Sequence, residues 1–187
     1  MVAACEAAGD GPMVVNSAGC GAHMKELHHL FAEGDPWRAR AARFAARVRD
    51  FSEVVAPALE ERAPLALPAG AVPGPAAWDD PCHLCHGQGV RAEPRRVLAR
   101  LGGLDLVALP GSESCCGSAG IYSLLRPADA AAVFAPKREA FAASGARTLI
   151  TANPGCQLQW EGGLRRAGDD ARVVHLAELV DRALAAE

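Results

Sequence analysis

Four cysteines in this sequence are spaced in a way that could bind a metal ion or a metal cluster. Thirty-two residues separate Cys82 from the adjacent pair Cys115-Cys116, and 38 residues separate Gly117 from Cys156. Adjacent cysteines form a disulfide with each other only under strain. Thiolates that converge in a fold bind soft metals and clusters. The pattern therefore favours metal ligation over a disulfide scaffold, with an unmetallated redox thiol site and inert buried cysteines as alternatives.

Each of these cysteines follows a strand-like run and stands in a loop rich in glycine or proline. The loops are Asp80-Pro81-Cys82, Ser114-Cys115-Cys116-Gly117-Ser118-Ala119-Gly120 and Asn153-Pro154-Gly155-Cys156. Ligand sites of parallel α/β sheets lie beyond the carboxyl ends of the strands. We therefore expect the four thiols to meet at one edge of a sheet.

The elements needed to position these loops can be predicted from runs of apolar residues. Strands are expected at 13–16, 77–79, 104–109, 147–151 and 172–175. Helices are expected over 37–51, 93–101, 128–143, 157–167 and 176–186, with Pro136 kinking or splitting the third. Strands that alternate with helices of this size predict an α/β fold with a parallel, Rossmann-like sheet.

An internal repeat suggests that the chain contains parts of two similar modules. Residues 3–20 align without a gap on 139–156, which places Cys20 over Cys156, and 48–55 resemble 173–180. We expect residues 1–62 to be the C-terminal part of a first, incomplete module, 63–76 a proline-rich linker, and 77–187 a complete second module. Cys20 should then be exposed, without thiol partners from its own module.

Composition narrows the range of partners and locations. The net charge of −3 and the pI near 6.1 give no electrostatic basis for nucleic-acid binding. The start of the chain has no secretory signal pattern, and seven cysteines without export favour thiol or metal chemistry. We expect a cytoplasmic protein, at most peripheral on the cytoplasmic side of the inner membrane.

The segment Cys82-His83-Leu84-Cys85-His86 matches the signature of covalent haem attachment. Such attachment would require export, so no haem is expected.

Taken together, these motifs resemble the cysteine-rich CCG-domain family. Its members include heterodisulfide reductase B-type subunits, lactate-utilisation proteins and the iron–sulfur subunit of glycolate oxidase, which the motifs resemble most. The second module carries Asp80-Pro81-Cys82-His83-Leu84, His86-Gly87-Gln88, Cys115-Cys116-Gly117-Ser118-Ala119-Gly120 and Asn153-Pro154-Gly155-Cys156-Gln157-Leu158-Gln159. The end of the first module carries Asn16-Ser17-Ala18-Gly19-Cys20-Gly21 and Met24-Lys25-Glu26.

The sequence departs from the family pattern in three ways. Asn153 stands where the full pattern has the first cysteine of a final Cys-x-x-Cys, and Cys85 stands where glutamine is expected. The ferredoxin part of the glycolate oxidase subunit is missing, so we expect a C-terminal fragment of a larger protein.

The resemblance implies a site and a role. A 4Fe–4S cluster, or alternatively a zinc ion, would be held by Cys82, Cys115, Cys116 and Cys156, with Cys85 and Cys20 as additional candidate ligands. Gly117 and Gly120 would let backbone amides approach the cofactor. The chain would be an electron-transfer subunit that carries neither flavin nor haem. It would pass electrons from a flavin-containing glycolate oxidase subunit, with other subunits of the complex, toward quinone. The alternatives are a lactate-utilisation or heterodisulfide-reductase-like redox subunit and a non-redox module stabilised by zinc.

Overall fold

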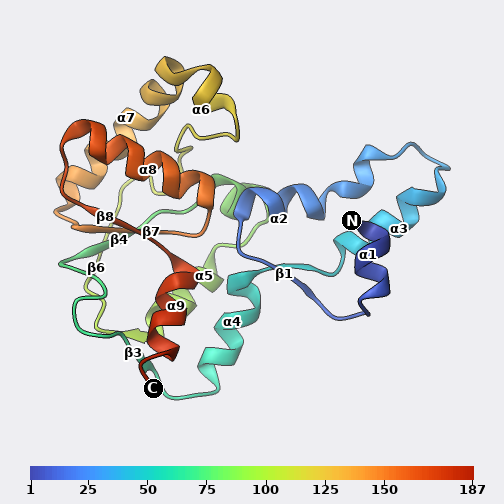
Figure 1. Ribbon diagram of the computed structural model, residues 1–187, viewed down its shortest axis with the longest axis horizontal. Helices are drawn as coiled ribbons and strands as arrows, with labels where there is room; N and C mark the ends of the chain where they lie inside the picture. Colours follow the sequence, from blue (N-terminus) through green and yellow to red (C-terminus); the bar gives the residue numbers. More distant parts are fainter.

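The centre of the protein is a parallel four-stranded sheet, as the sequence predicts. The computed structural model describes all of residues 1–187. The strand order is β6-β4-β7-β8, and every pairing is parallel (Figure 1). The four strands are β4 (Ala76–Trp78), β6 (Leu106–Val107), β7 (Thr148–Thr151) and β8 (Arg172–His175). The α/β, Rossmann-like fold prediction is confirmed.

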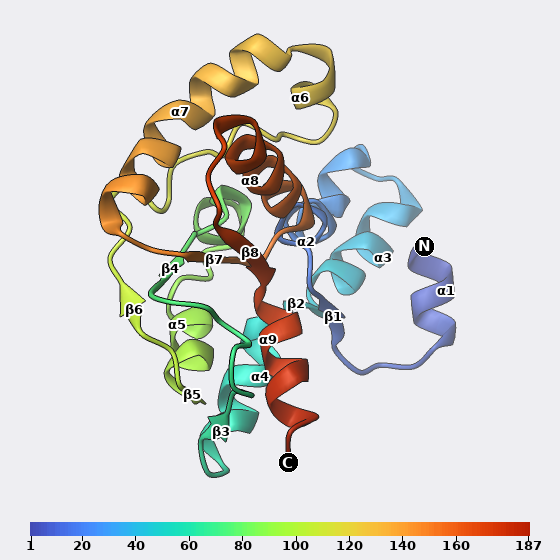
Figure 2. The same ribbon diagram turned by 60° about the vertical axis from the view of Figure 1, so that its left-hand side comes forward.

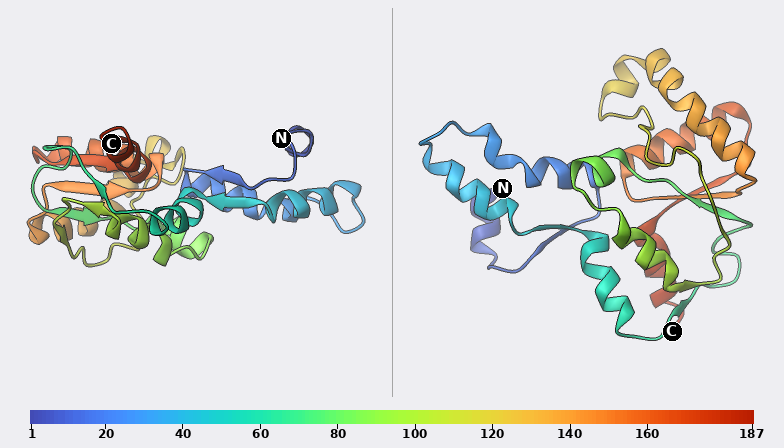
Figure 3. Two further views of the ribbon diagram at one scale, coloured as in Figure 1. Left: turned by 90° about the horizontal axis from the view of Figure 1, so that it is seen from below. Right: turned by 180° about the vertical axis from the view of Figure 1, so that it is seen from behind.

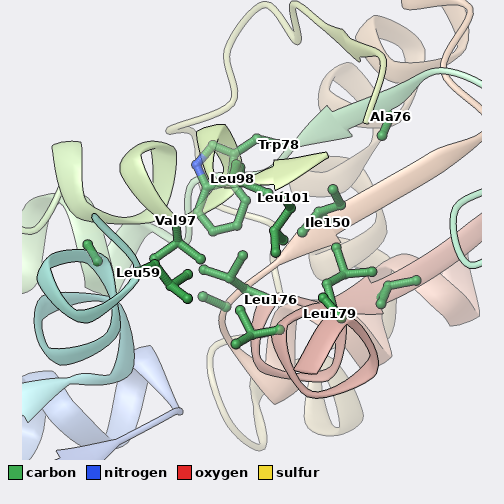
Figure 4. Close-up of a cluster of buried hydrophobic side chains, with 14 of the residues drawn as sticks. Leu59, Ala76, Trp78, Val97, Leu98, Leu101, Ile150, Leu176 and Leu179 are labelled. Carbon is green, nitrogen blue, oxygen red and sulfur yellow. The ribbon is translucent and has the colours of Figure 1, made fainter. Parts of the chain in front are cut away.

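Helices cover both faces of this sheet, so its central strands are apolar on both sides. On one face Trp78 and Ile150 pack with Leu59, Val97 and Leu176 (Figure 4). On the other face Ala77 and Leu149 pack with residues of α7 and α8. Figure 2 shows these two helices above the strands of the sheet. The helices around the sheet are α5 (Ala92–Ala99), α6 (Tyr122–Leu125), α7 (Pro127–Ser144), α8 (Pro154–Ala167) and α9 (Leu176–Leu184).

The first sixty residues form a smaller unit beside the sheet. Its elements are α1 (Val2–Ala7), β1 (Met13–Val15), α2 (Ala18–Lys25), the 3₁₀ turn η1 (Leu27–Leu30), α3 (Pro36–Ala45), β2 (Val48–Asp50) and α4 (Phe51–Glu60). A separate small core holds it together, which consists of Val2, Leu27, Ala41, Phe44 and Val48. Helices α1 and α3 reach away from the sheet, whereas α4 packs against α5 (Figure 3).

The two halves of the chain share one element order and one strand register. In the first unit Val15 is paired with Asp50, and in the second Thr151 is paired with His175. The sequence repeat aligns these positions, and Asp50 and His175 each cap the helix that follows. The segment 63–76 is partly built into the second unit, because β3 (Leu65–Ala66) pairs with β5 (Leu101–Gly102).

One local prediction is wrong, and one of the two outcomes expected at Pro136 does not occur. The helix expected over 37–51 ends at Ala45, and Val48 enters β2, where it is fully buried beside β1. Pro136 does not split its helix, because α7 runs through it from Pro127 to Ser144. The buried positions Ala130, Phe134, Lys137 and Phe141 hold α7 on both sides of the proline, and this packing compensates for the lost backbone hydrogen bond.

None of the helices combines the length and the hydrophobicity needed to cross a membrane.

The packing of α7 on α8 depends on a glycine. A Cβ atom at Gly163 would lie 2.2 Å from Cε1 of Phe134, whereas at Gly162 it would meet only the tip of Arg166, at 3.2 Å. We predict that Gly163→Ala lowers the free energy of unfolding by about 1–3 kcal/mol through overpacking. Gly162→Ala should raise it by roughly 0.5–1 kcal/mol through helix propensity.

Chemical denaturation of the two variants measures both changes. Adding Phe134→Leu to Gly163→Ala should recover part of the loss. Equal effects of the two alanine substitutions would contradict the close packing of α7 on α8.

Candidate metal centre

Five cysteines from four separate segments line one cavity. The cavity has a volume of about 450 Å³ and lies between the first unit and the carboxyl edge of the sheet. Its cysteines are Cys20, Cys82, Cys115, Cys116 and Cys156. The structure therefore brings together the four cysteines of the predicted ligand set and adds Cys20 at the rim.

The sheet places these residues through the loops that follow its strands. Cys82 follows β4 and caps the π-helical turn η2 (His83–Gly87), and Cys156 lies in the first turn of α8, after β7. Cys115 and Cys116 stand in the loop between β6 and α6. Since β4 and β7 are adjacent and parallel, their following loops meet at one edge.

A buried carboxylate fixes the start of the first loop. Asp80 accepts hydrogen bonds from Trp78 Nε1 at 2.7 Å, from Ser112 Oγ at 2.6 Å, and from both Nη atoms of Arg95 at 2.7 and 2.8 Å. Burial alone would raise the pKa of Asp80, but these donors outweigh it and lower the pKa. Asp80 thus ties the Cys82 loop to the segment that leads into Cys115.

Two sulfurs lie unusually close together. Cys116 Sγ is 2.9 Å from Cys156 Sγ, and both side chains are buried. The contact with Cys156 lowers the pKa of Cys116, while the same contact and burial raise the pKa of Cys156, so loss of a proton from one thiol makes loss of the second harder. In a tetrahedral thiolate site, metal–sulfur bonds near 2.3 Å put sulfurs about 3.7 Å apart. A metal would therefore require the pair to separate by less than about 1 Å.

Cys115 also affects the ionisation of Cys82. Burial, followed by the charge and hydrogen bond of Cys115, raises the pKa of Cys82 to about 11. The amide of Gly117 donates to Cys115 Sγ at 3.3 Å. Cys115 is exposed at the mouth of the cavity. No three of these thiols are grouped closely enough to hold a metal ion as they stand, although all four line one cavity. Thiols are the donors that a thiophilic metal or an iron–sulfur cluster takes, and binding would displace their protons.

The two predicted glycines differ in how tightly they are held. Gly117 has φ +80°, and a Cβ atom there would lie 2.5 Å from the carbonyl oxygen of Ala130. Gly120 has φ +62°, and a Cβ atom there would contact nothing within 4 Å. Both let the loop turn beside the cysteines, but only Gly117 is also required by close approach to α7.

The two additional candidate cysteines lie in different places. Cys20 is exposed, as expected, and lies in the first turn of α2, on the rim of the cavity. Cys85 is buried outside the cavity, with its sulfur 3.8 Å from the carbonyl oxygen of Cys82. In this geometry Cys85 is a packed thiol, and its role as an additional ligand stays a prediction.

Asn153 has a role that the sequence did not reveal. Its Oδ1 accepts a hydrogen bond from the amide of Gly19 at 3.1 Å, and its Nδ2 donates to Cys156 Sγ at 3.4 Å. Gln88 Nε2 donates to the carbonyl oxygen of Ala18 at 2.9 Å. The bonds of Asn153 hold the first turn of α2 against the first turn of α8, and the bond of Gln88 holds it against the end of η2. The Asn153 side chain therefore connects the first unit to the cysteine cavity. From the sequence, Asn153 could be recognised only as the residue that stands in place of a cysteine.

The glycine geometry allows a matched test. We predict that Gly117→Ala lowers the thermal unfolding temperature of the metal-free chain more than Gly120→Ala. Both substitutions place alanine at positive φ, at a cost of about 1–2 kcal/mol, but only the first also collides with the backbone of Ala130. Calorimetry measures the difference, and equal temperatures would contradict the close approach at Gly117.

Comparison with known proteins places this geometry in a family. The profile of the cysteine-rich CCG domain matches residues 76–161, which contain Cys82, Cys115, Cys116 and Cys156. A probable glycolate oxidase iron–sulfur subunit of Bacillus subtilis is 35% identical over 96% of this chain, which spans 40% of that protein. Lactate utilization protein A of Geobacillus kaustophilus is 33% identical over 90% of this chain and 69% of its own length. The same protein of Lysinibacillus sphaericus is 31% identical over 90% of this chain and 72% of its own length. The chain therefore belongs to the family of cysteine-rich CCG-domain proteins that these relatives represent.

Proposed function

We propose that this chain is an electron-transfer component of a complex that oxidises glycolate or a related 2-hydroxy acid. The observation that carries the proposal is the cavity in which Cys82, Cys115, Cys116 and Cys156 converge from three loops. Similarity to an iron–sulfur subunit of glycolate oxidase supports an iron–sulfur cluster as the occupant, and we propose the 4Fe–4S type. When bound, the cluster would accept and release single electrons.

The residues of the chain would hold such a group and adjust its charge. The four thiols lose their protons on binding, and the Gly117 amide, already directed at Cys115 Sγ, stabilises negative charge on sulfur. The N-terminus of α8 adds the positive end of a helix dipole beside Cys156. Since Cys115 is exposed, electrons could enter and leave at the mouth of the cavity.

The remaining components of the proposal come from the resemblance to the glycolate oxidase subunit described in the sequence analysis. A separate flavin-containing subunit would oxidise the hydroxy acid, and this chain would pass the electrons onward toward quinone. It would act in the cytoplasm or peripherally on the inner membrane. Within the chain, residues 77–187 would form the complete CCG module and 1–62 the end of a preceding one, joined by 63–76.

Two alternatives remain distinct. Similarity to lactate utilization protein A favours the same chemistry in a complex that acts on lactate. A set of four thiols also suits a tetrahedral structural zinc, which would make the module a non-redox interaction unit. The metal content of the chain separates zinc from iron.

The test is anaerobic reconstitution of the full chain with ferrous iron and sulfide. We predict about four iron atoms and four sulfides per chain, with the visible absorption and electron paramagnetic resonance of a cluster. Cys115→Ser should lose most of the bound iron without a large change in stability, because Cys115 is exposed. Cys85→Ala should retain it, because Cys85 lies outside the cavity.

Three results would change the assignment. One tightly bound zinc per chain, without sulfide, would support the structural alternative. Loss of iron in Cys85→Ala equal to that in Cys115→Ser would show that the ligand set is wrong. A changed spectrum in Cys20→Ser would add Cys20 to the ligands.

A further inference from the structure

A buried lysine lies behind the Cys-Cys-Gly loop. Lys137 projects from α7, its Nζ lies 2.5 Å from Asp79 Oδ1, and it donates a hydrogen bond to the carbonyl oxygen of Ser114 at 2.6 Å. The side chains of Lys137 and Asp79 are 2% and 0% exposed. Ser114 directly precedes Cys115, so the lysine connects the buried carboxylate to the backbone of the cysteine loop.

Asp79 is held equally firmly on the sheet side. It follows β4, its amide donates to the carbonyl oxygen of Ile150 at 2.8 Å, and its Oδ2 accepts from Thr151 Oγ1 at 2.9 Å. Burial raises the pKa of Asp79, and Lys137 and Thr151 offset part of that increase. The pair thus joins the ends of β4 and β7 to α7 and to the loop that carries Cys115 and Cys116.

A buried ion pair of this kind is costly to desolvate and is often less stabilising than apolar residues of similar volume. Its position suggests an electrostatic role, because both charges lie behind the cysteine loop. Lys137 stands on α7 between Phe134 and Phe141, which pack in one buried cluster with Cys116 and Cys156. Charges act more strongly in a dry interior than in water.

We propose that Lys137 and Asp79 are a positioning pair that holds the Cys-Cys-Gly loop and sets the reduction potential of the centre bound by its cysteines. This inference rests on the proposed function for the existence of a redox centre. Reduction adds an electron to that centre. The positive charge of Lys137 therefore favours the reduced form, and the negative charge of Asp79 favours the oxidised form.

The two charges make opposite predictions for the midpoint potential, which separates an electrostatic role from a structural one. In the reconstituted full chain, Lys137→Met should shift the potential to a more negative value, and Asp79→Asn should shift it to a more positive value. Lys137→Arg keeps the charge and should stay closer to the wild type than Lys137→Met. Loosening of the structure alone would move the potentials of Lys137→Met and Asp79→Asn in the same direction.

The chain offers a matched control pair. Lys25 Nζ lies 2.8 Å from Glu53 Oε2, both side chains are half-buried, and neither lines the cavity. Lys25→Met and Glu53→Gln make the same chemical changes and should leave the potential unchanged. Unchanged potentials in Lys137→Met and Asp79→Asn, or shifts of one sign in both, would overturn the electrostatic part of the proposal.

Hydrogen exchange in the metal-free full chain tests the positioning part without a bound centre. Amides of residues 115–118 should exchange faster in Lys137→Met than in Lys25→Met, because the anchor at the Ser114 carbonyl is lost. Equal exchange rates in Lys137→Met and Lys25→Met would overturn the positioning part of the proposal. This result can be obtained even if the variants at Lys137 and Asp79 bind no iron. A wild-type chain that binds only zinc would reject the redox function and the tuning of the potential, while the exchange result would still decide positioning.

Discussion

The pairing of β4 with β7 is the constraint on which the site depends. Trp78 is in register with Ile150, so the turns that follow these strands begin at the same height on the sheet. One turn leads to Cys82 and the other to Cys156, although 74 positions separate these cysteines in the sequence. A strand slip of one residue would exchange the apolar positions of the two faces and move Cys156 away from Cys116. The cysteine cavity is therefore as well defined as the hydrophobic core beneath it.

How far the sequence could predict this protein depended on the range of the interactions involved. Strand positions and the convergence of Cys82, Cys115, Cys116 and Cys156 follow from apolar runs and loop composition, which are local signals. The helix expected through Val48 was wrong because the heptad-like spacing concealed the alternation of buried and exposed positions in Val48-Arg49-Asp50, which is the period of a strand. The resemblance of 48–55 to 173–180 aligns Val48 with Val173, which lies in a strand, so the repeat would have predicted a strand at Val48.

The contacts that complete the site could not be predicted in the same way. In the sequence nothing distinguishes Lys137 from other lysines in helices, and Asp79 is 58 positions away from it. Their contact exists only because α7 packs over the cysteine loop. In the sequence Asn153 is only the replacement of a cysteine, and its contact with the first turn of α2 is visible only in the structure. Both roles arise from side chains that meet only after the sheet and helices have packed, and no local pattern encodes such a meeting.

The bridge made by Asn153 has a thermodynamic consequence. Its amide contacts the first unit through Gly19 and the cavity through Cys156. Occupancy of the cavity and docking of the first unit are therefore coupled, and such coupling is reciprocal. Whatever binds the cysteines changes how firmly α2 is held, and a partner that pulls on α2 changes the affinity of the cavity by the same factor.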